Sequence, residues 1–189
     1  MKRIILASKS PRRRELLSSL TDSFEVITEE VDEALPLGID IRRGTELLAI
    51  RKGSAVARKE RDALVISSDT LVELDGVALG KPKDEADAHL MLSCLSARSH
   101  NVHTGVAVHC GGRVYSAVAT SSVTFKALTD EEIYGYIATG EPMDKAGSYG
   151  IQGLGGKFVE RYDGDFDTIM GLSMTLVREL IDKAGGLDD

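Results

Sequence analysis

The chain has 189 residues, of which 42% are hydrophobic, so it is long enough and apolar enough to bury a substantial core. Its formal net charge of -7 disfavours a general nucleic-acid binder, because phosphate backbones select basic surfaces, but a small anionic ligand can still occupy a local basic pocket. No apolar run reaches transmembrane length, and the apolar stretch at 4–7 is far too short for a secretory signal. We therefore expect a cytoplasmic protein with no nucleic-acid or membrane partner.

Strands and helices alternate in the first third of the chain, and hairpins follow in the middle. The elements expected, in chain order, are a strand at 2–7, a helix from 11, a strand at 24–28, a helix at 45–60, a strand at 63–68, a hairpin at 71–79, a helix at 84–95, a hairpin of strands 102–108 and 113–127, a helix at 130–138, a strand at 158–162 and a last helix at 167–184. This order predicts an α/β fold with a mixed sheet. The chain has no internal repeat and no long linker, which predicts a single domain over 1–189.

The first expected helix begins within the sequence SKSPRRR, which suits an anion site. Ser10 is a candidate N-cap, and Pro11 suits the first helical position because its missing N–H costs nothing there. The free N–H groups and the positive end of the helix dipole attract anions, and the Ser8 and Ser10 hydroxyls add donors. Arg12 and Arg13 oppose the dipole, which suggests that an anion lies between them and the helix. A solvated basic face or a modification site is the alternative.

The sequence SSDT, at 67–70, ends the clearest buried strand of the chain. A carboxylate at the C-terminal end of such a strand lies where α/β folds place their chemistry, so Asp69 is a candidate catalytic residue. A turn aspartate is the alternative interpretation. Lys81, in the rigid loop GKP, and Lys52, on the preceding helix, are basic candidates, although each by itself is also typical of a surface lysine.

The glycine-dense sequence GIQGLGGK, at 150–157, matches neither a phosphate-binding P-loop nor a dinucleotide fingerprint. Its glycines allow either close approach to a ligand or tight turns. Gln152 is the one residue there whose amide can donate to and accept from a base edge at once. Separately, Asp32 and Glu33 lie in an acidic loop, and their oxygen donors suit magnesium or manganese.

Together these motifs resemble the Maf family of nucleoside triphosphate pyrophosphatases. The motifs that carry the resemblance are LASKSPRRRELL, VDE at 31–33, SSDTLV, GKP, TGV at 104–106, AGSYGIQG and DFDTIMGL. Their order and combined spacing are far more specific than any one motif, and they cover nearly the whole chain. One departure is the closing motif, which usually reads GLP and is Gly171-Leu172-Ser173 here.

The resemblance implies an elongated α/β fold of the Maf and ITPase-like kind, with a mixed sheet flanked by helices and two lobes around a nucleotide-binding cleft. It also implies a cytoplasmic enzyme, a homodimer, that needs a divalent cation, Mg²⁺ or Mn²⁺. The catalytic acidic residue of the family corresponds to Asp69, and its pair of basic residues corresponds to Lys52 and Lys81. The resemblance also implies that Ser8, Ser10, Arg12 and Arg13 bind phosphate, and that Glu33 and Asp69 bind the metal. Arg12, Thr70 and Gln152 match the residues of the branch that acts on dTTP and UTP.

The expected reaction is hydrolysis of dTTP and UTP to the nucleoside monophosphate and pyrophosphate. Three alternatives stay open at this point. The protein could act on another nucleotide, such as CTP, a modified pyrimidine or 7-methyl-GTP. It could cleave at the γ-phosphate instead, or it could regulate septum formation and cell division by binding a partner.

Overall fold

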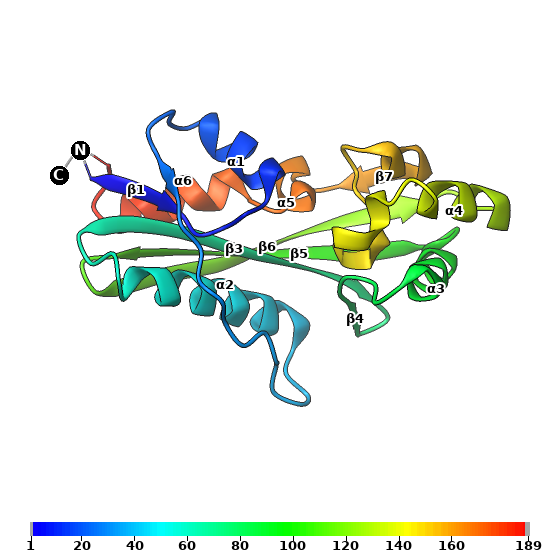
Figure 1. The fold of residues 1–189 in the computed structure, drawn as a ribbon, viewed down its shortest axis with the longest axis horizontal. Helices are drawn as coiled ribbons and strands as arrows, with labels where there is room; N and C mark the ends of the chain where they lie inside the picture. Colours follow the sequence, from blue (N-terminus) through cyan, green and yellow to red (C-terminus); the bar gives the residue numbers. More distant parts are fainter. Residues whose placement is uncertain (1, 188–189) are drawn as a thin grey trace. The chain divides into compact units, whose positions relative to one another are not determined.

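The computed structural model describes residues 2–187, which fall into two compact units (Figure 1). Unit 1 comprises Met1–Thr70, Thr104–Ala119 and Gly171–Asp189, and unit 2 comprises Leu71–His103 and Thr120–Met170. Strands β3 (Ala63–Leu74), β5 (Ser99–Cys110) and β6 (Arg113–Phe125) each contribute residues to both units.

Unit 1 is a sheet with helices on both of its faces. Its strand order is β2 (Glu25–Val26), β1 (Arg3–Leu6), β3, β5 and β6, and β1 runs parallel to both of its neighbours. Side chains alternate along β1, so Ile4 packs with the core beneath α1 (Pro11–Ser18) and α6 (Met174–Lys183), whereas Ile5 packs with Val56 of α2 (Ile41–Ala57). Figure 1 shows α2 on one face of these strands and α1 and α6 on the other.

Unit 2 is built on the remaining parts of β3, β5 and β6. Strand β4 (Val77–Leu79) pairs antiparallel with β3, and β7 (Val159–Asp163) pairs antiparallel with β6. The helical elements are α3 (Glu85–Leu95), α4 (Asp130–Ile137), α5 (Phe166–Met170) and the short 3₁₀ helices η1 (Glu141–Asp144), η2 (Ala146–Ser148) and η3 (Leu154–Phe158). Its core contains aromatic side chains, and the rings of Tyr136 and Phe158 meet edge to face with centroids 5.1 Å apart.

The predicted mixed α/β fold is confirmed, and so are two helix starts. Ser10 caps α1, and Thr129 and Glu132 form a capping box at α4. The prediction that SSDT ends a strand was wrong: β3 continues to Leu74 because Val72–Leu74 pair with β4, so Asp69 lies within the strand. Two helix predictions were wrong in extent. Helix α2 begins at Ile41 rather than 45, because the Asp40 carboxylate accepts a hydrogen bond from the Arg43 N–H at 3.0 Å.

The expected last helix at 167–184 is also wrong, since it is two helices. Gly171 has φ of 112°, which interrupts the helical backbone after α5. Ser173 then caps α6 by accepting from the Leu176 N–H at 3.4 Å. The serine that departs from the usual closing motif therefore begins a helix. Among the residues described, no helix is both long and apolar enough to cross a membrane.

Candidate active site

The N-terminus of α1 forms the first part of the site, in unit 1. The Ser10 hydroxyl accepts from the Arg13 N–H at 3.5 Å, and the buried Ser8 hydroxyl accepts from the Ser10 N–H at 3.3 Å. Pro11 occupies the first helical position, as predicted. The loop that precedes α1 therefore brings two hydroxyl groups to the positive end of the helix.

Arg13 holds this helix to two other segments of unit 1. Its Nε donates to the carbonyl oxygen of Gly171 at 2.8 Å, and one terminal nitrogen donates to the Ser68 carbonyl at 2.9 Å. The other terminal nitrogen donates to the Thr70 hydroxyl at 3.1 Å. Burial is the main cause that lowers the pKa of Arg13, and the charge of Asp69 opposes this shift.

The contacts of Arg13 and Arg12 differ. Each nitrogen of the Arg13 guanidinium donates to a protein group, whereas Arg12 makes no side-chain hydrogen bond or ion pair with the part of the chain that the structure describes. The phosphate-binding role of both residues stays a prediction. Of the two, the Arg12 guanidinium is the one still available to a ligand.

Asp69, Lys52 and Glu33 form the charged part of the site. The Lys52 ammonium contacts the Asp69 carboxylate, and it lies 2.9 Å from Oε1 of Glu33. Asp69 is buried, with 7% of its surface exposed, so an unpaired carboxylate there would be costly. The two carboxylates therefore converge on one ammonium group.

Close packing of α2 on the sheet places Lys52. A Cβ at its neighbour Gly53 would collide with the His109 ring and the Ser67 hydroxyl. The Ser67 hydroxyl also donates to the carbonyl oxygen of Ala49 at 2.7 Å, one turn earlier in α2. Only glycine at position 53 lets the helix approach this closely, which brings the Lys52 side chain to Asp69 in the middle of β3.

Arg51 fixes the loop that carries Glu33. One of its terminal nitrogens donates to the carbonyl oxygens of Asp32 and Ala34, at 3.1 and 2.6 Å. The residue between these two carbonyls is Glu33. Adjacent residues of α2 therefore hold the loop backbone and pair with its carboxylate.

Lys81 and Gln152 belong to unit 2, and both are exposed. Lys81 follows Gly80, whose carbonyl accepts from the Gly147 N–H at 3.0 Å. Gln152 lies between the 3₁₀ helices η2 and η3. The structure thus brings together Ser8, Ser10, Arg12, Arg13, Glu33, Lys52, Asp69 and Thr70 in unit 1, and it places the other two predicted site residues in unit 2.

Sequence reasoning missed Gly171 and Thr104 as members of this network. The Gly171 carbonyl accepts from Arg13 and from the Ser68 hydroxyl, and a Cβ at Gly171 would lie 3.2 Å from Nε of Arg13. The Thr104 hydroxyl lies 2.9 Å from that of Thr70. Both residues stand in motifs that carry the family resemblance, so their motifs were a signal, but their roles depend on contacts between distant segments.

The carboxylates fit a divalent cation of the magnesium kind. Among the described residues there is no group of three or more His, Cys, Asp or Glu side chains that could hold a metal ion alone. Mg²⁺ typically uses only one or two carboxylates and takes its other oxygens from substrate phosphates and water. Glu33 and Asp69, which converge on one point, provide such a pair.

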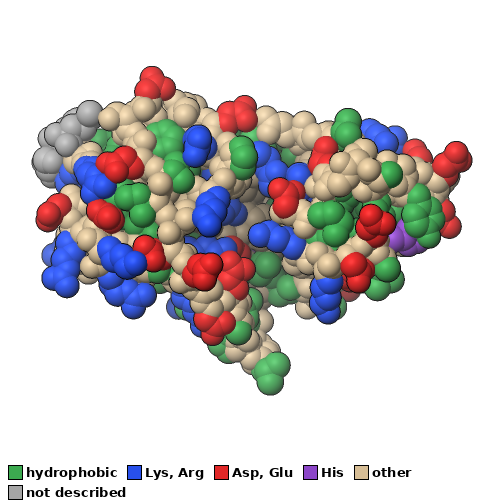
Figure 2. Space-filling model, viewed as in Figure 1, with side chains coloured by type: hydrophobic (Ala, Val, Ile, Leu, Met, Phe, Trp, Pro, Cys, Tyr) green, Lys and Arg blue, Asp and Glu red, His purple; other side chains and the backbone are tan. Residues whose placement is uncertain are grey.

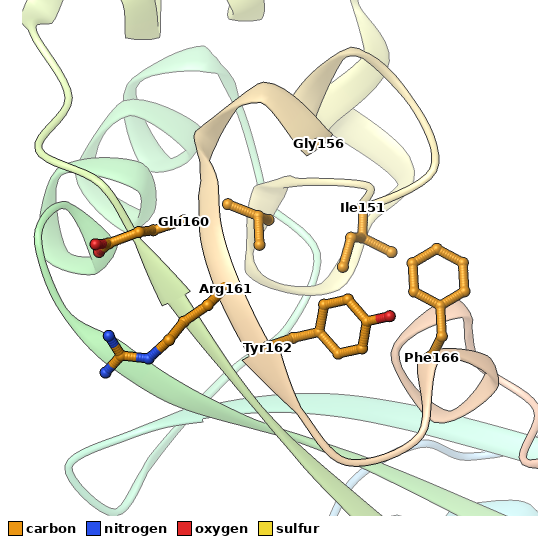
Figure 3. A pocket seen from close by; sticks show the side chains of 7 residues that line it. Ile151, Gly156, Glu160, Arg161, Tyr162 and Phe166 are labelled. Atoms are coloured by element: carbon orange, nitrogen blue, oxygen red, sulfur yellow. The ribbon is translucent and has the colours of Figure 1, made fainter.

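A separate hollow lies in unit 2 beside β7 (Figure 3). Its apolar side includes Ile151 and the rings of Tyr162 and Phe166, whose centroids are 5.6 Å apart. In Figure 3 the Glu160 and Arg161 side chains point away from this apolar cluster. None of the predicted site residues lines the hollow, so we assign it no part in the chemistry.

The fold and these contacts define an α/β protein whose charged residues meet beside the middle of a long strand, β3, in a setting suited to a phosphorylated ligand. The model of the family described as Maf-like protein matches residues 3–184. The chain therefore belongs to the Maf family.

Curated relatives agree with this membership. A dTTP/UTP pyrophosphatase of Bacillus cytotoxicus is 47% identical over 181 residues, which cover 95% of each chain. One of Desulfitobacterium hafniense is 44% identical over 194 residues and covers 98% of this chain and 87% of its own. The solved structure of the Staphylococcus aureus Ham1 protein matches 66% of this chain and 72% of its own, at 20% identity and a TM-score of 0.49, a likeness too weak to support an argument.

Proposed function

We propose that this protein is a nucleoside triphosphate pyrophosphatase that hydrolyses dTTP and UTP to the monophosphate and pyrophosphate. The observation that carries the proposal is the buried Asp69 carboxylate paired with Lys52, in a chain 47% identical to a protein named dTTP/UTP pyrophosphatase. The pairing supports the reaction type, and the relatives' names support the substrate.

In the proposed reaction a water molecule attacks the α-phosphorus. Asp69 takes a proton from this water, a new P–O bond forms, and the bond between the α-phosphorus and the bridging oxygen breaks to release pyrophosphate. Lys52 and the N-terminus of α1 stabilise negative charge on the phosphate oxygens, which is usually the dominant contribution in phosphoryl chemistry. Ser8, Ser10 and Arg12 supply further donors, and Lys81 is proposed to supply charge from unit 2.

Glu33 and Asp69 are the residues that would hold a divalent cation, Mg²⁺ or Mn²⁺. Such an ion would neutralise charge on the triphosphate and polarise its oxygens. The proposal rests on the oxygen chemistry of these two side chains and on their shared contact with Lys52.

Gln152 is proposed to read the base. Uracil and thymine present a carbonyl beside an N3–H, so one amide can donate to the first and accept from the second. Cytosine mismatches one of these contacts. Thr70 was expected to assist, and its hydroxyl has partners in Arg13 and Thr104, so we assign it first to the support of the site.

The test is a panel of nucleoside triphosphates with analysis of both products, using purified protein. We expect dTTP and UTP to be the best canonical substrates, CTP to be weaker and purine triphosphates to be poorest. Release of inorganic phosphate alone would show cleavage at the γ-phosphate. Faster turnover of GTP, ATP or 7-methyl-GTP would refute the substrate proposal, and no turnover at all would favour a regulator of cell division.

We also propose that the protein is a cytoplasmic homodimer. Light scattering coupled to size-exclusion chromatography tests the oligomeric state, and a monomer at micromolar concentration would contradict the proposal. Fractionation of cells tests the location.

A further inference from the structure

One partly buried carboxylate, that of Glu141 in η1, organises the glycine loop, by which we mean residues 150–156. Its Oε2 accepts from the Leu154 N–H at 3.0 Å. Its Oε1 accepts from the Gly155 N–H at 3.2 Å and from the Tyr136 hydroxyl at 2.8 Å. Both N–H groups lie at the start of η3, so this carboxylate caps that element from a distant position in the chain.

The other side of the glycine loop is held through Tyr136. This residue is fully buried in α4, and its hydroxyl accepts from the Gly150 N–H at 3.3 Å while it donates to Glu141. The backbone is thus fixed two residues before Gln152 and two residues after it. Gln152 itself is exposed between these fixed points.

The glycines of the loop are explained by the same side chains. A Cβ at Gly153 would collide with the Glu141 carboxylate. One at Gly155 would lie 2.6 Å from the Tyr136 hydroxyl, and one at Gly150 would lie 2.8 Å from Cε of Lys145. These three glycines therefore permit the protein itself to approach the loop, in addition to any approach by a ligand.

The charge state of Glu141 suits its contacts. Although partial burial acts to raise the pKa of Glu141, hydrogen bonds from Leu154, Tyr136 and Gly155 lower it below its ordinary value. An ionised carboxylate only accepts, and here it faces three donors. A glutamine has one accepting oxygen and one donating nitrogen, so Glu141→Gln would set a donor against donors while keeping the size of the side chain.

We infer that Glu141 is a positioning residue for base selection, which acts by holding the glycine loop in the one conformation that presents Gln152 to the base. The inference rests on the proposed function for the identity of the base. Glu141 does not itself need to touch the nucleotide, and its effect passes through the backbone on either side of Gln152.

The experiment compares Glu141→Gln with Glu131→Gln in the full chain. Glu131 lies on α4 in the same unit and makes no side-chain hydrogen bond or ion pair with any described residue, so it is a matched control. Tyr136→Phe is the milder second variant, because it keeps the buried ring and removes only the hydroxyl that contacts Glu141 and Gly150. For each protein kcat and KM are measured with UTP and with CTP, and amide hydrogen exchange is measured over 150–155.

We expect Glu141→Gln to lower the preference for UTP over CTP by about tenfold or more, mainly through the KM for UTP, since one paired polar contact is misplaced. Exchange over 150–155 should become faster, and Tyr136→Phe should change both readouts in the same direction and by less. In a Gln152→Ala background, Glu141→Gln should alter the preference by less than about twofold, because the residue it positions is gone.

An equal loss on UTP and CTP with their ratio unchanged would overturn the inference, and so would a change fully additive with Gln152→Ala. Unchanged exchange over 150–155 would overturn it independently of any activity. If the wild-type protein does not prefer UTP to CTP, the proposed function fails instead. Faster exchange together with loss of whichever preference the wild type shows would then still support the role of Glu141.

Discussion

At the scale of single residues, the arginines of α1 differ in what their guanidinium groups touch. Arg13 donates to the carbonyl oxygens of Gly171 and Ser68, whereas Arg12 has no such partner among the described residues and Arg14 is exposed. A basic run that looks uniform in the sequence therefore contains a structural arginine and one that is available to a ligand.

Arg13→Ala should mainly reduce stability, and Arg12→Ala should mainly weaken substrate binding. Loss of the Arg13 guanidinium removes a donor from the Ser68 carbonyl and one of the two donors of the Gly171 carbonyl, and a buried group left unsatisfied costs about 1–3 kcal/mol. Urea unfolding should show this decrease for Arg13→Ala, while Arg12→Ala should raise KM at unchanged stability. Arg14→Ala is the control. Equal stability of all three variants would contradict this assignment.

Asp69→Asn should leave the protein folded and lower kcat by at least about 100-fold, the usual scale for removal of a general base. The amide keeps the volume of the buried side chain but cannot accept a proton from water. Asp62→Asn, at an exposed turn of unit 1, should retain full activity. Circular dichroism checks the fold, and near-normal turnover in a folded Asp69→Asn protein would remove this residue from the mechanism.

At the scale of elements, the contact between α2 and the sheet depends on glycine. A Cβ at Gly105 of β5 would lie 2.7 Å from the carbonyl oxygen of Thr45 in α2. Backbone atoms cannot rotate away as a side chain can, so the whole helix would have to move. Since α2 also carries Lys52, the packing of this helix fixes the position of a candidate catalytic side chain.

Gly105→Ala should therefore lower stability by about 1–3 kcal/mol, as expected for overpacking, and should also reduce kcat by displacing Lys52. Gly135→Ala is a control in which stability should increase rather than decrease. Gly135 lies in α4 with nothing within 4 Å of an added Cβ, so alanine should stabilise that helix by about 0.5–1 kcal/mol. Denaturant unfolding measures the stability of both variants. A Gly105→Ala protein with unchanged stability and activity would refute the close approach of β5 to α2.

Strand β5 carries two buried histidines that resist protonation. Burial lowers the pKa of both His100 and His109 from 6.5 to about 4. The Nδ1 atom of each is buried without a hydrogen-bond partner among the described residues. Because only the unfolded chain binds these protons between pH 6.5 and 4, their stabilising contribution is complete above pH 6.5 and is lost as the pH falls toward 4.

The free energy of unfolding should fall by on the order of 3 kcal/mol for each of these two histidines when the pH falls from 6.5 to 4. In His100→Gln, which keeps a polar group near the Tyr149 hydroxyl, the decrease in unfolding free energy over this range should be smaller than in the wild type. Identical pH profiles for His100→Gln and the wild type would contradict the prediction.

The sequence predicted most elements but not their exact extents. Hydrophobic patterning located the strands and caps located α1 and α4, because these signals are local. By contrast β3 continues from Ala63 to Leu74 as one strand, and Gly171 divides the last helix. The 3₁₀ helices around Gln152 were not foreseen, because glycine-rich sequence is compatible with many backbone conformations.

At the scale of the whole molecule, the net charge of -7 gives a triphosphate no general attraction. Figure 2 shows acidic and basic side chains interspersed over the visible face. In unit 1, moreover, Lys52 is already paired with two carboxylates. Binding of a highly charged anion therefore requires neutralisation from elsewhere.

We accordingly expect a chelator to abolish activity and Mg²⁺ or Mn²⁺ to restore it. Glu33→Gln should raise the metal concentration needed for half-maximal rate, because one of the two proposed carboxylate ligands is lost. Glu30→Gln, at an exposed position of the same loop, should leave this metal concentration unchanged. Full activity in the presence of chelator would refute the metal requirement.

The candidate site could be predicted as a set of residues but not as a set of contacts. The motif SSDTLV identified Asp69, the family resemblance assigned a role to Lys52, and the structure joins the two side chains. The bond from Arg13 to Gly171 links residues 158 positions apart, and no local pattern predicts such a pair. The role of Glu141 was not predicted for the same reason, since its contacts with Leu154 and Gly155 form only when η1 and η3 pack together.

The packing of the glycine loop has a consequence for how such proteins diverge. Its backbone is fixed from within by Glu141 and Tyr136, whereas the side chain at Gln152 is exposed. Because Glu141 and Tyr136 hold the backbone on either side, a substitution at position 152 should leave the loop folded, and under the proposed base-reading role it should change the nucleotide preference. Gly153 and Gly155 have no such freedom, since any side chain there meets the protein itself. Selection for a new substrate should accordingly enrich changes at position 152 and leave these glycines untouched.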